Sequence, residues 1–263
     1  MTAAEDGCYD FFHEPLPAES RLSYLSTMVP MSLSHRPLHW EFLGRVPYRE
    51  ALELQLAVRE GIKRGRGPEH LLLLEHPPVY TLGRNASAAD VLAAPEWLAA
   101  RGIELVECDR GGQVTYHGPG QLVGYPILNL SPDRRDVRRY VRDLQELLIR
   151  TLADYGVRAE PRDGQAFVGV WVGEEKIASI GVHLSRWITT HGFALNVSTD
   201  LTDFAGIVPC GLRGIGITSI ERLTGSAPPL PEIAAVCARH AGEIFDRELV
   251  VGAPAVPAGA GAA

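Results

Sequence analysis

Cys210 has the surroundings of a nucleophile rather than those of a core residue. It lies between Pro209 and Gly211, in a segment that has no apolar stripe. A free thiol has a pKa of ~8.5, so only about 3% is thiolate at pH 7, and a nucleophilic cysteine therefore needs a neighbouring base or cation. The alternative is a small buried hydrophobic residue, the commonest environment of a free cysteine. Cys108, at the end of an expected strand, and Cys237, within an expected helix, fit that alternative.

Lys176 is the second residue that could do chemistry. On a regular extended strand, Lys176 shares one face with Ala178, Ile180 and Val182. Desolvation among small and apolar neighbours disfavours the charged form of an amine, which makes the neutral amine available as a base. The alternative is a solvated lysine at the end of a hairpin.

Three histidines, His117, His183 and His191, are other possible partners of a thiol. Any of them could activate Cys210 in the manner of a thiol protease. No fixed ligand spacing relates them, so the sequence does not predict a metal site. The spacing along the chain also does not decide which of them meets Cys210.

The segment 110–121, with the sequence RGGQVTYHGPGQ, has the composition of one wall of a ligand site. Glycine lets the backbone approach a ligand closely, and Pro119 stiffens the segment. Hydrogen-bonding groups come from Arg110, Thr115, Tyr116, His117 and Gln121. The alternative is a glycine-rich turn between two strands, because a glycine loop alone is weak evidence of binding.

Helices and strands alternate around these residues. Apolar periodicity predicts helices over 48–63, 95–101 and 231–249, and strands over 40–46, 71–75, 103–108, 122–130 and 189–198. A further helix, beginning at Ser131-Pro132-Asp133 and running to about Tyr155, is predicted from its capping residues. Residues 166–172 and 176–183 flank Gly173-Glu174-Glu175, which indicates a β-hairpin. The alternation favours an α/β (α+β) fold with a mixed sheet.

Arginines recur on one face of the helix expected over 131–155, at Arg134, Arg138 and Arg142. The simplest explanation is a solvated face with salt bridges to Asp136 and Glu146. The alternative is a docking surface for an acidic protein.

Length and composition indicate an ordinary soluble protein. The chain has 263 residues, a formal net charge of -7 and a pI near 5.7, which argues against nucleic acid as its main partner. Its four cysteines are scattered, which favours reduced thiols over a structural zinc site. No signal core or membrane-spanning run is evident, so we expect a cytoplasmic protein without a membrane partner. We expect a poorly structured extension over 1–36, one catalytic domain over 37–250 and a flexible Ala/Gly/Pro tail over 251–263.

Five motifs together resemble the lipoyl(octanoyl) transferase family. They are LLEHPPVYTLG at 73–83, RGGQVTYHGPGQ at 110–121, KIASIG at 176–181, HGFALN at 191–196 and VPCG at 208–211. They occur in the order typical of that family and extend over about residues 40–250. The resemblance implies a single domain with a mixed sheet and helices on one side, like the catalytic domain of biotin and lipoate protein ligases.

The resemblance also implies an activity. Members of this family transfer an octanoyl (or lipoyl) group from acyl carrier protein, through a cysteine thioester, to a lysine of a lipoyl domain. The acceptor domains belong to 2-oxo-acid dehydrogenase complexes and to the glycine-cleavage carrier protein. This is the first step of endogenous protein lipoylation, and a separate enzyme inserts sulfur afterwards. Thioester exchange is nearly isoenergetic, so no ATP and no other cofactor is expected.

Transferred residue by residue, the resemblance makes Cys210 the acyl-thioester nucleophile and Lys176 its partner. The substrate-binding positions that it implies are Arg110, Gly111, Gly112, Gln113, Val114, Thr115, Tyr116, His117, Ser179, Ile180, Gly181, Gly192, Phe193 and Ala194. Three other functions compete with this one: an ATP-dependent lipoate or biotin protein ligase, a non-catalytic module that docks carrier domains, and a thiol hydrolase.

Overall fold

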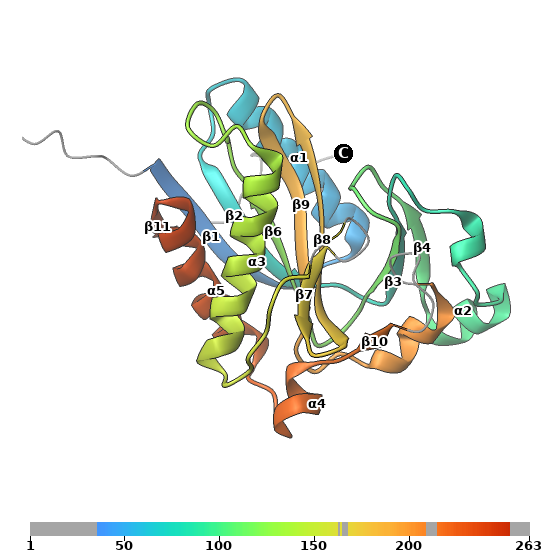
Figure 1. Cartoon of the computed structure of the whole chain (residues 1–263). Coiled ribbons are helices and arrows are strands. Elements are labelled where there is room, and N and C mark those ends of the chain that lie inside the picture. Colours follow the sequence, from blue (N-terminus) through green and yellow to red (C-terminus); the bar gives the residue numbers. More distant parts are fainter. Residues whose placement is uncertain (1–35, 163, 165–167, 209–214, 253–263) are drawn as a thin grey trace, which may run out of the picture. The chain divides into compact units, whose positions relative to one another are not determined.

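The computed structural model describes residues 36–162, 164, 168–208 and 215–252, which form two β-sheets and their covering helices (Figure 1). The strands are β1 (Arg36–Arg45), β2 (Glu69–Glu75), β3 (Val79–Leu82), β4 (Glu104–Glu107), β5 (Val114–His117), β6 (Gln121–Ile127), β7 (Gly169–Val172), β8 (Glu175–Ser185), β9 (Ile188–Asn196), β10 (Gly216–Ile217) and β11 (Arg247–Val251). The α-helices are α1 (Tyr48–Lys63), α2 (Pro95–Arg101), α3 (Val137–Asp154), α4 (Ile220–Thr224) and α5 (Leu230–Phe245). Two short 3-10 helices, Ala88–Asp90 and Leu201–Gly206, complete the described elements.

The larger sheet is mixed, as the sequence predicts. Its strand order is β10-β8-β9-β6-β2-β1-β11, and β7 pairs with β8 beside this path. β1 is parallel to β2 and β11, and β10 is parallel to β8. The remaining pairs of this sheet are antiparallel, including the predicted β7–β8 hairpin.

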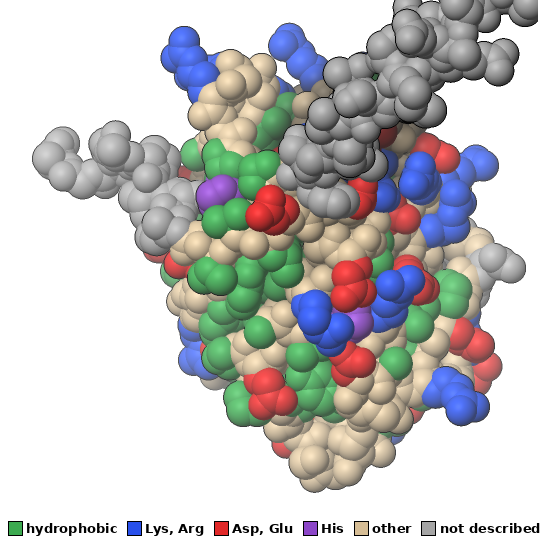
Figure 2. Space-filling model, turned by 90° about the vertical axis from the view of Figure 1, so that its left-hand side faces the viewer, with side chains coloured by type: hydrophobic (Ala, Val, Ile, Leu, Met, Phe, Trp, Pro, Cys, Tyr) green, Lys and Arg blue, Asp and Glu red, His purple; other side chains and the backbone are tan. Residues whose placement is uncertain are grey.

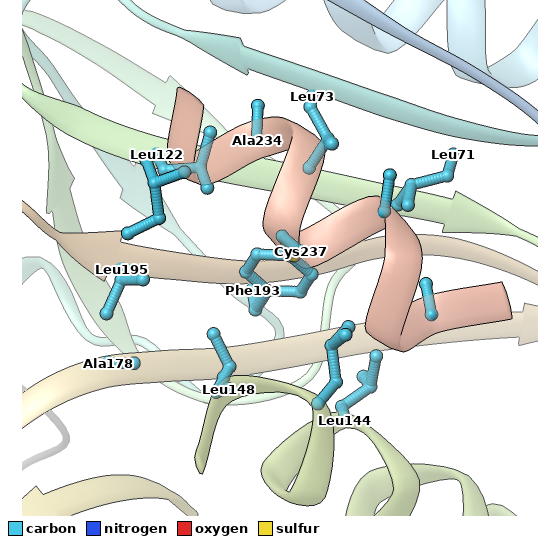
Figure 3. Packing of buried hydrophobic residues seen from close by; sticks show 14 of the residues in the cluster. Leu71, Leu73, Leu122, Leu144, Leu148, Ala178, Phe193, Leu195, Ala234 and Cys237 are labelled. Atoms are coloured by element: carbon cyan, nitrogen blue, oxygen red, sulfur yellow. The ribbon is translucent and has the colours of Figure 1, made fainter. Parts of the chain in front are cut away.

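Helices cover both faces of the larger sheet. Successive side chains of a strand point to opposite faces, and β2 follows this rule. Leu71 and Leu73 pack with α3 and α5, in the cluster that also contains Phe193 and Cys237 (Figure 3). Leu72 and Leu74 pack with Ala51, Val58 and Ile62 of α1. The expectation of helices on one side of the sheet is therefore wrong, because the Leu-rich strand is apolar on both faces.

α3 begins five residues later than its capping signal predicts, because the observed cap is Asp136 and not Ser131. The first helical residue is Val137, and the Asp136 side chain accepts a hydrogen bond of 3.0 Å from the backbone N–H of Arg139. This bond satisfies one of the donors that a helix start leaves unpaired. The Ser131 hydroxyl instead accepts from the Arg135 guanidinium at 2.6 Å. Asp136 thus caps the helix and also interacts electrostatically with Arg138 and Arg142.

Two features arise from contacts that are distant in sequence. A second sheet, with the order β4-β3-β5, forms beside the main one and was not predicted as such. The C-terminal helix stops at Phe245 because Asp246 takes a left-handed conformation, and β11 follows where helix was expected. Arg247 then donates to the buried Glu69 carboxylate at 2.5 Å and fixes β11 near β2.

Among the described residues, none of the helices combines the length and apolar character needed to cross a bilayer.

Candidate active site

A cleft lies between β8 and β9 of the larger sheet and the segment that leads into β5. It contains about 510 Å³ of empty space, part of it open to solvent. Most of the predicted binding residues line it: Arg110, Gly112, Gln113, Val114, Thr115, His117, Ser179, Ile180, Gly181, Gly192, Phe193 and Ala194, together with Lys176. Tyr48, Tyr125 and His191 also line it and were not among the predicted binding positions.

Two predicted residues, Gly111 and Tyr116, do not line the cleft. The Gly111 backbone N–H donates to the Val182 carbonyl at 2.9 Å, which joins the segment 110–121 to β8. The Tyr116 hydroxyl donates to an Asp203 carboxylate oxygen at 2.7 Å and its ring packs in the core of the smaller sheet. Both residues hold the wall in place from behind.

The Arg110 side chain is turned into the protein. Its guanidinium donates to the Thr81 carbonyl at 2.6 Å and to the Thr81 hydroxyl at 2.8 Å. Gly83 leaves room for it, because a Cβ at Gly83 would lie 2.7 Å from the guanidinium Nη1 and 2.4 Å from the Gly112 carbonyl. Arg110 therefore ties the segment to β3, and its guanidinium is occupied by protein acceptors rather than directed at a ligand.

A β-bulge brings Lys176 into the cleft. Val170 pairs with Ala178, but the next residue, Trp171, pairs with Lys176, so Ile177 is an extra residue of β8. Such a bulge re-aims the side chains that precede it. Ile177 and Ala178 both pack in the core beneath α3, while Lys176 lines the cleft.

The predicted alternation of β8 is therefore wrong at Lys176. Lys176, Ser179 and Gly181 line the cleft, whereas Ala178 and Val182 pack in or against the core with α3 and α5. Ile180 contacts that core and also lines the cleft. Without the bulge, the strand period would place the amine in that core, where an uncompensated charge is costly. Only 2% of Lys176 is exposed.

The chain contains few lysines, so the presence of a lysine at position 176 is informative. Lys63 and Lys176 are its only lysines, and the other 23 of its 25 basic residues are arginines. Arginine stays protonated in proteins, whereas lysine can lose its proton when it is buried. The buried position of Lys176 in the cleft is therefore filled by one of the two basic residues of the chain that are not arginine.

Two buried histidines, His117 and His76, lie next to each other, and His117 lines the cleft. The His117 Nδ1–H donates to the Gln121 side-chain oxygen at 2.8 Å, and its ring lies 5.7 Å from that of His76. Burial holds the pKa of His117 well below the ordinary value and lowers the pKa of His76 to about 4. Both imidazoles are neutral at pH 7, so they act as fixed hydrogen-bonding groups.

His191 closes one end of the cleft through a hydrogen bond to Asp109. The His191 backbone is left-handed (φ 57°), and its N–H donates to the Gln55 side chain on α1 at 2.7 Å. Its Nε2–H donates to an Asp109 carboxylate oxygen at 2.7 Å. Burial lowers the pKa of His191, and the hydrogen bond from His191 lowers the pKa of Asp109 to about 2. Within the described residues, no group of three or more His, Cys, Asp or Glu side chains is arranged to hold a metal ion.

Removal of the Asp109 carboxylate should loosen the wall that begins at Arg110. We expect Asp109→Ala to raise the KM for the substrate that binds in the cleft about tenfold, since a hydrogen bond to a charged group contributes about 1.5–3 kcal/mol. The kcat should change less than about twofold, because no reacting group is removed. Steady-state kinetics tests this, with the exposed Glu107 two residues earlier as the control position (Glu107→Ala). A fall in kcat at unchanged KM would contradict the assignment.

The structure describes Cys108 and Cys237. Cys237 is buried between α5 and its neighbours, and burial raises its pKa to about 12. The Cys108 thiol lies 3.3 Å from the Leu82 carbonyl. Cys237 fits the expectation of a buried core residue, whereas Cys108 is only partly buried. Cys210, the predicted nucleophile, lies outside the described residues.

The arginine face of α3 lies across the sheet from the cleft. α3 packs with α5 on one face of the sheet, and Tyr48 of α1 reaches the cleft from the other face. Arg134 is largely buried, pairing with Asp143 at 2.9 Å and donating to the Ile244 carbonyl. On the face of the molecule that carries α5 and β11, basic and acidic side chains are mixed (Figure 2). This mixing favours a solvated, salt-bridged surface.

Solved structures of low sequence identity share the fold. A lipoate-protein ligase A bound with ATP aligns with a TM-score of 0.66 at 19% identity, covering 84% of this chain and 89% of that one. A bi-partite lipoate protein ligase from Thermoplasma acidophilum aligns with a TM-score of 0.63 at 20% identity, covering 83% and 86%. The fold is that of lipoate ligase catalytic domains.

Sequence comparison identifies the family within this fold class. The model of the lipoyl protein ligase A/B catalytic domain matches residues 47–242. An octanoyltransferase from Solibacter usitatus is 53% identical over 213 residues, which is 80% of this chain and 94% of the relative. One from Myxococcus xanthus is 50% identical over 218 residues, and the aligned part is 81% of this chain and 60% of that longer relative. The chain therefore belongs to the octanoyltransferase family.

Proposed function

We propose that this chain transfers an octanoyl (or lipoyl) group from acyl carrier protein to a lysine of a lipoyl domain, through a thioester on Cys210. The observation that carries the proposal is the buried amine of Lys176 in the cleft of an octanoyltransferase family member. Acceptors would be the lipoyl domains of 2-oxo-acid dehydrogenase complexes and the glycine-cleavage carrier protein. We assign the reaction to the cytoplasm.

The first half of the reaction moves the acyl group onto the enzyme. Lys176 accepts the thiol proton of Cys210, and the thiolate attacks the carbonyl carbon of the donor thioester. The new C–S bond forms while the bond to the carrier's thiol breaks, and the leaving thiolate takes the proton back from the Lys176 ammonium. One thioester replaces another, so the step needs no ATP.

The second half forms an amide. The amine of the acceptor lysine attacks the thioester on Cys210, the C–S bond breaks, and a proton of the amine passes to Lys176 or to the leaving thiolate. The glycine-lined cleft would hold the acyl chain between these steps. Burial of its methylenes contributes ~0.8 kcal/mol each.

The described residues support a meeting of Cys210 with Lys176. Ile217 of β10, seven residues after Cys210, pairs with Lys176, and the Thr218 N–H donates to the Lys176 carbonyl at 3.0 Å. On the other side, the Val208 N–H donates to the Asp90 carbonyl at 2.8 Å. The chain is thus fixed on both sides of the segment 209–214, and one anchor is Lys176 itself.

The mass of the intact protein tests the proposal. After mixing with octanoyl-acyl carrier protein in the absence of ATP, we expect one octanoyl group on the native chain and none on Cys210→Ala. Addition of a lipoyl domain should discharge the adduct and yield octanoylated domain. Modification only with free octanoate and ATP would indicate a ligase, and carrier binding without acyl transfer would indicate a docking module.

A further inference from the structure

The Lys176 side chain runs over a glycine on the neighbouring strand. A Cβ at Gly169 of β7 would lie 2.4 Å from Lys176 Cε and 3.2 Å from its Nζ. The same Cβ would lie 2.4 Å from the Ala178 carbonyl oxygen of β8. Distances this short are below any that real Cβ atoms show, so a residue with a Cβ at this position would force both the lysine side chain and the β7–β8 backbone to shift. Gly169 also has φ 150°, a conformation that side chains with a Cβ rarely adopt. Position 169 therefore leaves the path of Lys176 free.

An aromatic ring borders the same amine. Lys176 Nζ lies 5.6 Å from the centroid of the Trp171 ring, within the range of a cation–π interaction. Trp171 is fully buried, and the Arg162 guanidinium lies 4.6 Å from its centroid. The buried indole therefore restricts where the amine of Lys176 can lie.

A buried amide fixes Gly169 from the other face of the sheet. Gln145 of α3 donates from Nε2 to the Gly169 carbonyl at 3.1 Å, and both groups are buried. This carbonyl is not part of the β7–β8 bulge, which begins one residue later. Gln145 thus holds the glycine that the lysine crosses, at the point where β7 begins.

We propose that Gly169 and Trp171 form a cradle that positions the Lys176 amine for proton transfer, with Gln145 holding the cradle in place. The inference rests on the proposed catalytic role of Lys176. Gly169 and Trp171 are positioning residues, since neither lines the cleft, and they act through Lys176. The bulge determines the face of the sheet on which Lys176 lies. The cradle determines how far the amine lies from the sheet.

Gly169→Ala tests the cradle, with Gly173→Ala as the matched control. Gly173 lies in the same hairpin with φ 54°, and a Cβ there would meet no atom within 4 Å. Both variants strain the backbone, but only Gly169→Ala places a Cβ against Lys176 and against the Ala178 carbonyl, and a Lys176→Met background separates these two effects. We expect Gly169→Ala to lower kcat about 10²-fold, as a misplacement of ~1 Å does. The KM for the octanoyl donor should stay within about threefold, and Gly173→Ala should keep the native kcat.

A Lys176→Met background shows whether the effect passes through the amine. In that background Gly169→Ala should change the residual rate less than about twofold, since coupled positions are not additive. An equal loss in both backgrounds, or a native kcat for Gly169→Ala, would refute the cradle. A native chain that forms no acyl adduct would instead refute the proposed function.

Trp171 provides a second test should Gly169→Ala not fold. Trp171→Phe keeps a ring beside the amine, whereas Trp171→Leu keeps an apolar side chain without a ring. We expect about tenfold lower kcat for the leucine variant and a change within about threefold for the phenylalanine variant, because only phenylalanine keeps a cation–π contact with the amine. Equal rates for the two variants would contradict the role of the ring.

Discussion

Replacement of Lys176 with methionine is expected to lower kcat/KM for octanoyl transfer by at least about 10³-fold. Positioned proton transfer contributes about 10²–10⁴-fold, and methionine removes both the base and the cation that stabilises a thiolate. The fold should persist, because methionine has a similar length and its burial carries no charge penalty. Lys176→Arg should be almost as inactive, since arginine keeps the charge but does not give up its proton.

The other lysine of the chain is the natural control. Lys63 lies on α1 and pairs with Glu60 at 2.8 Å, so Lys63→Met should keep the native rate. Single-turnover kinetics with octanoyl-acyl carrier protein, followed by addition of lipoyl domain, measures the two halves of the reaction separately. If Lys176→Arg retained more than about a tenth of the native rate, electrostatic stabilisation and not proton transfer would be the role of Lys176.

Local sequence signals were sufficient for most of the elements that carry the site. The apolar spacing of 48–63 predicts α1 with the bounds that the structure has, because one buried stripe of Tyr48, Ala51, Val58 and Ile62 determines it. The β7–β8 hairpin follows from its short polar turn, since Gly173 takes the left-handed conformation there. Both are decided by residues close together in the chain.

The orientation of Lys176 could not be predicted, because it depends on a pairing between strands. The bulge at Ile177 exists only relative to Val170 and Trp171 on β7, and strand period alone places Lys176 on the wrong face. Tyr48, Tyr125 and His191 reach the cleft from three different elements, and no local pattern relates them. The composition carries one further signal. Arginine occupies 23 of the 25 basic positions, so a lysine at position 176 indicates a role that arginine does not fill.

Lowering the pH should destabilise this protein over a pH range that is set by the pKa values of its buried histidines. His76 is fully buried, its Nδ1–H donates to the Val46 carbonyl at 2.6 Å, and its Nε2 accepts from the Tyr125 hydroxyl at 2.7 Å. Burial lowers its pKa to about 4, whereas an exposed histidine titrates near 6.5. The unfolded chain therefore binds a proton more readily than the native one. Stability from His76 is complete above pH ~6.5 and declines as the pH falls toward 4.

At pH 5 the expected loss from His76 is about 2 kcal/mol, or 1.36 kcal/mol for each of ~1.5 pH units. His117 and His191, whose pKa values burial also lowers, add to the loss in the same direction. Urea unfolding at pH 7.5 and pH 5 measures it. His76→Gln keeps a donor and an acceptor without a titrating group, so its loss should be smaller by about 2 kcal/mol. Added salt should leave this difference unchanged, because it arises from burial and not from exposed charges. An equal loss in both proteins would show that His76 is not the group that titrates.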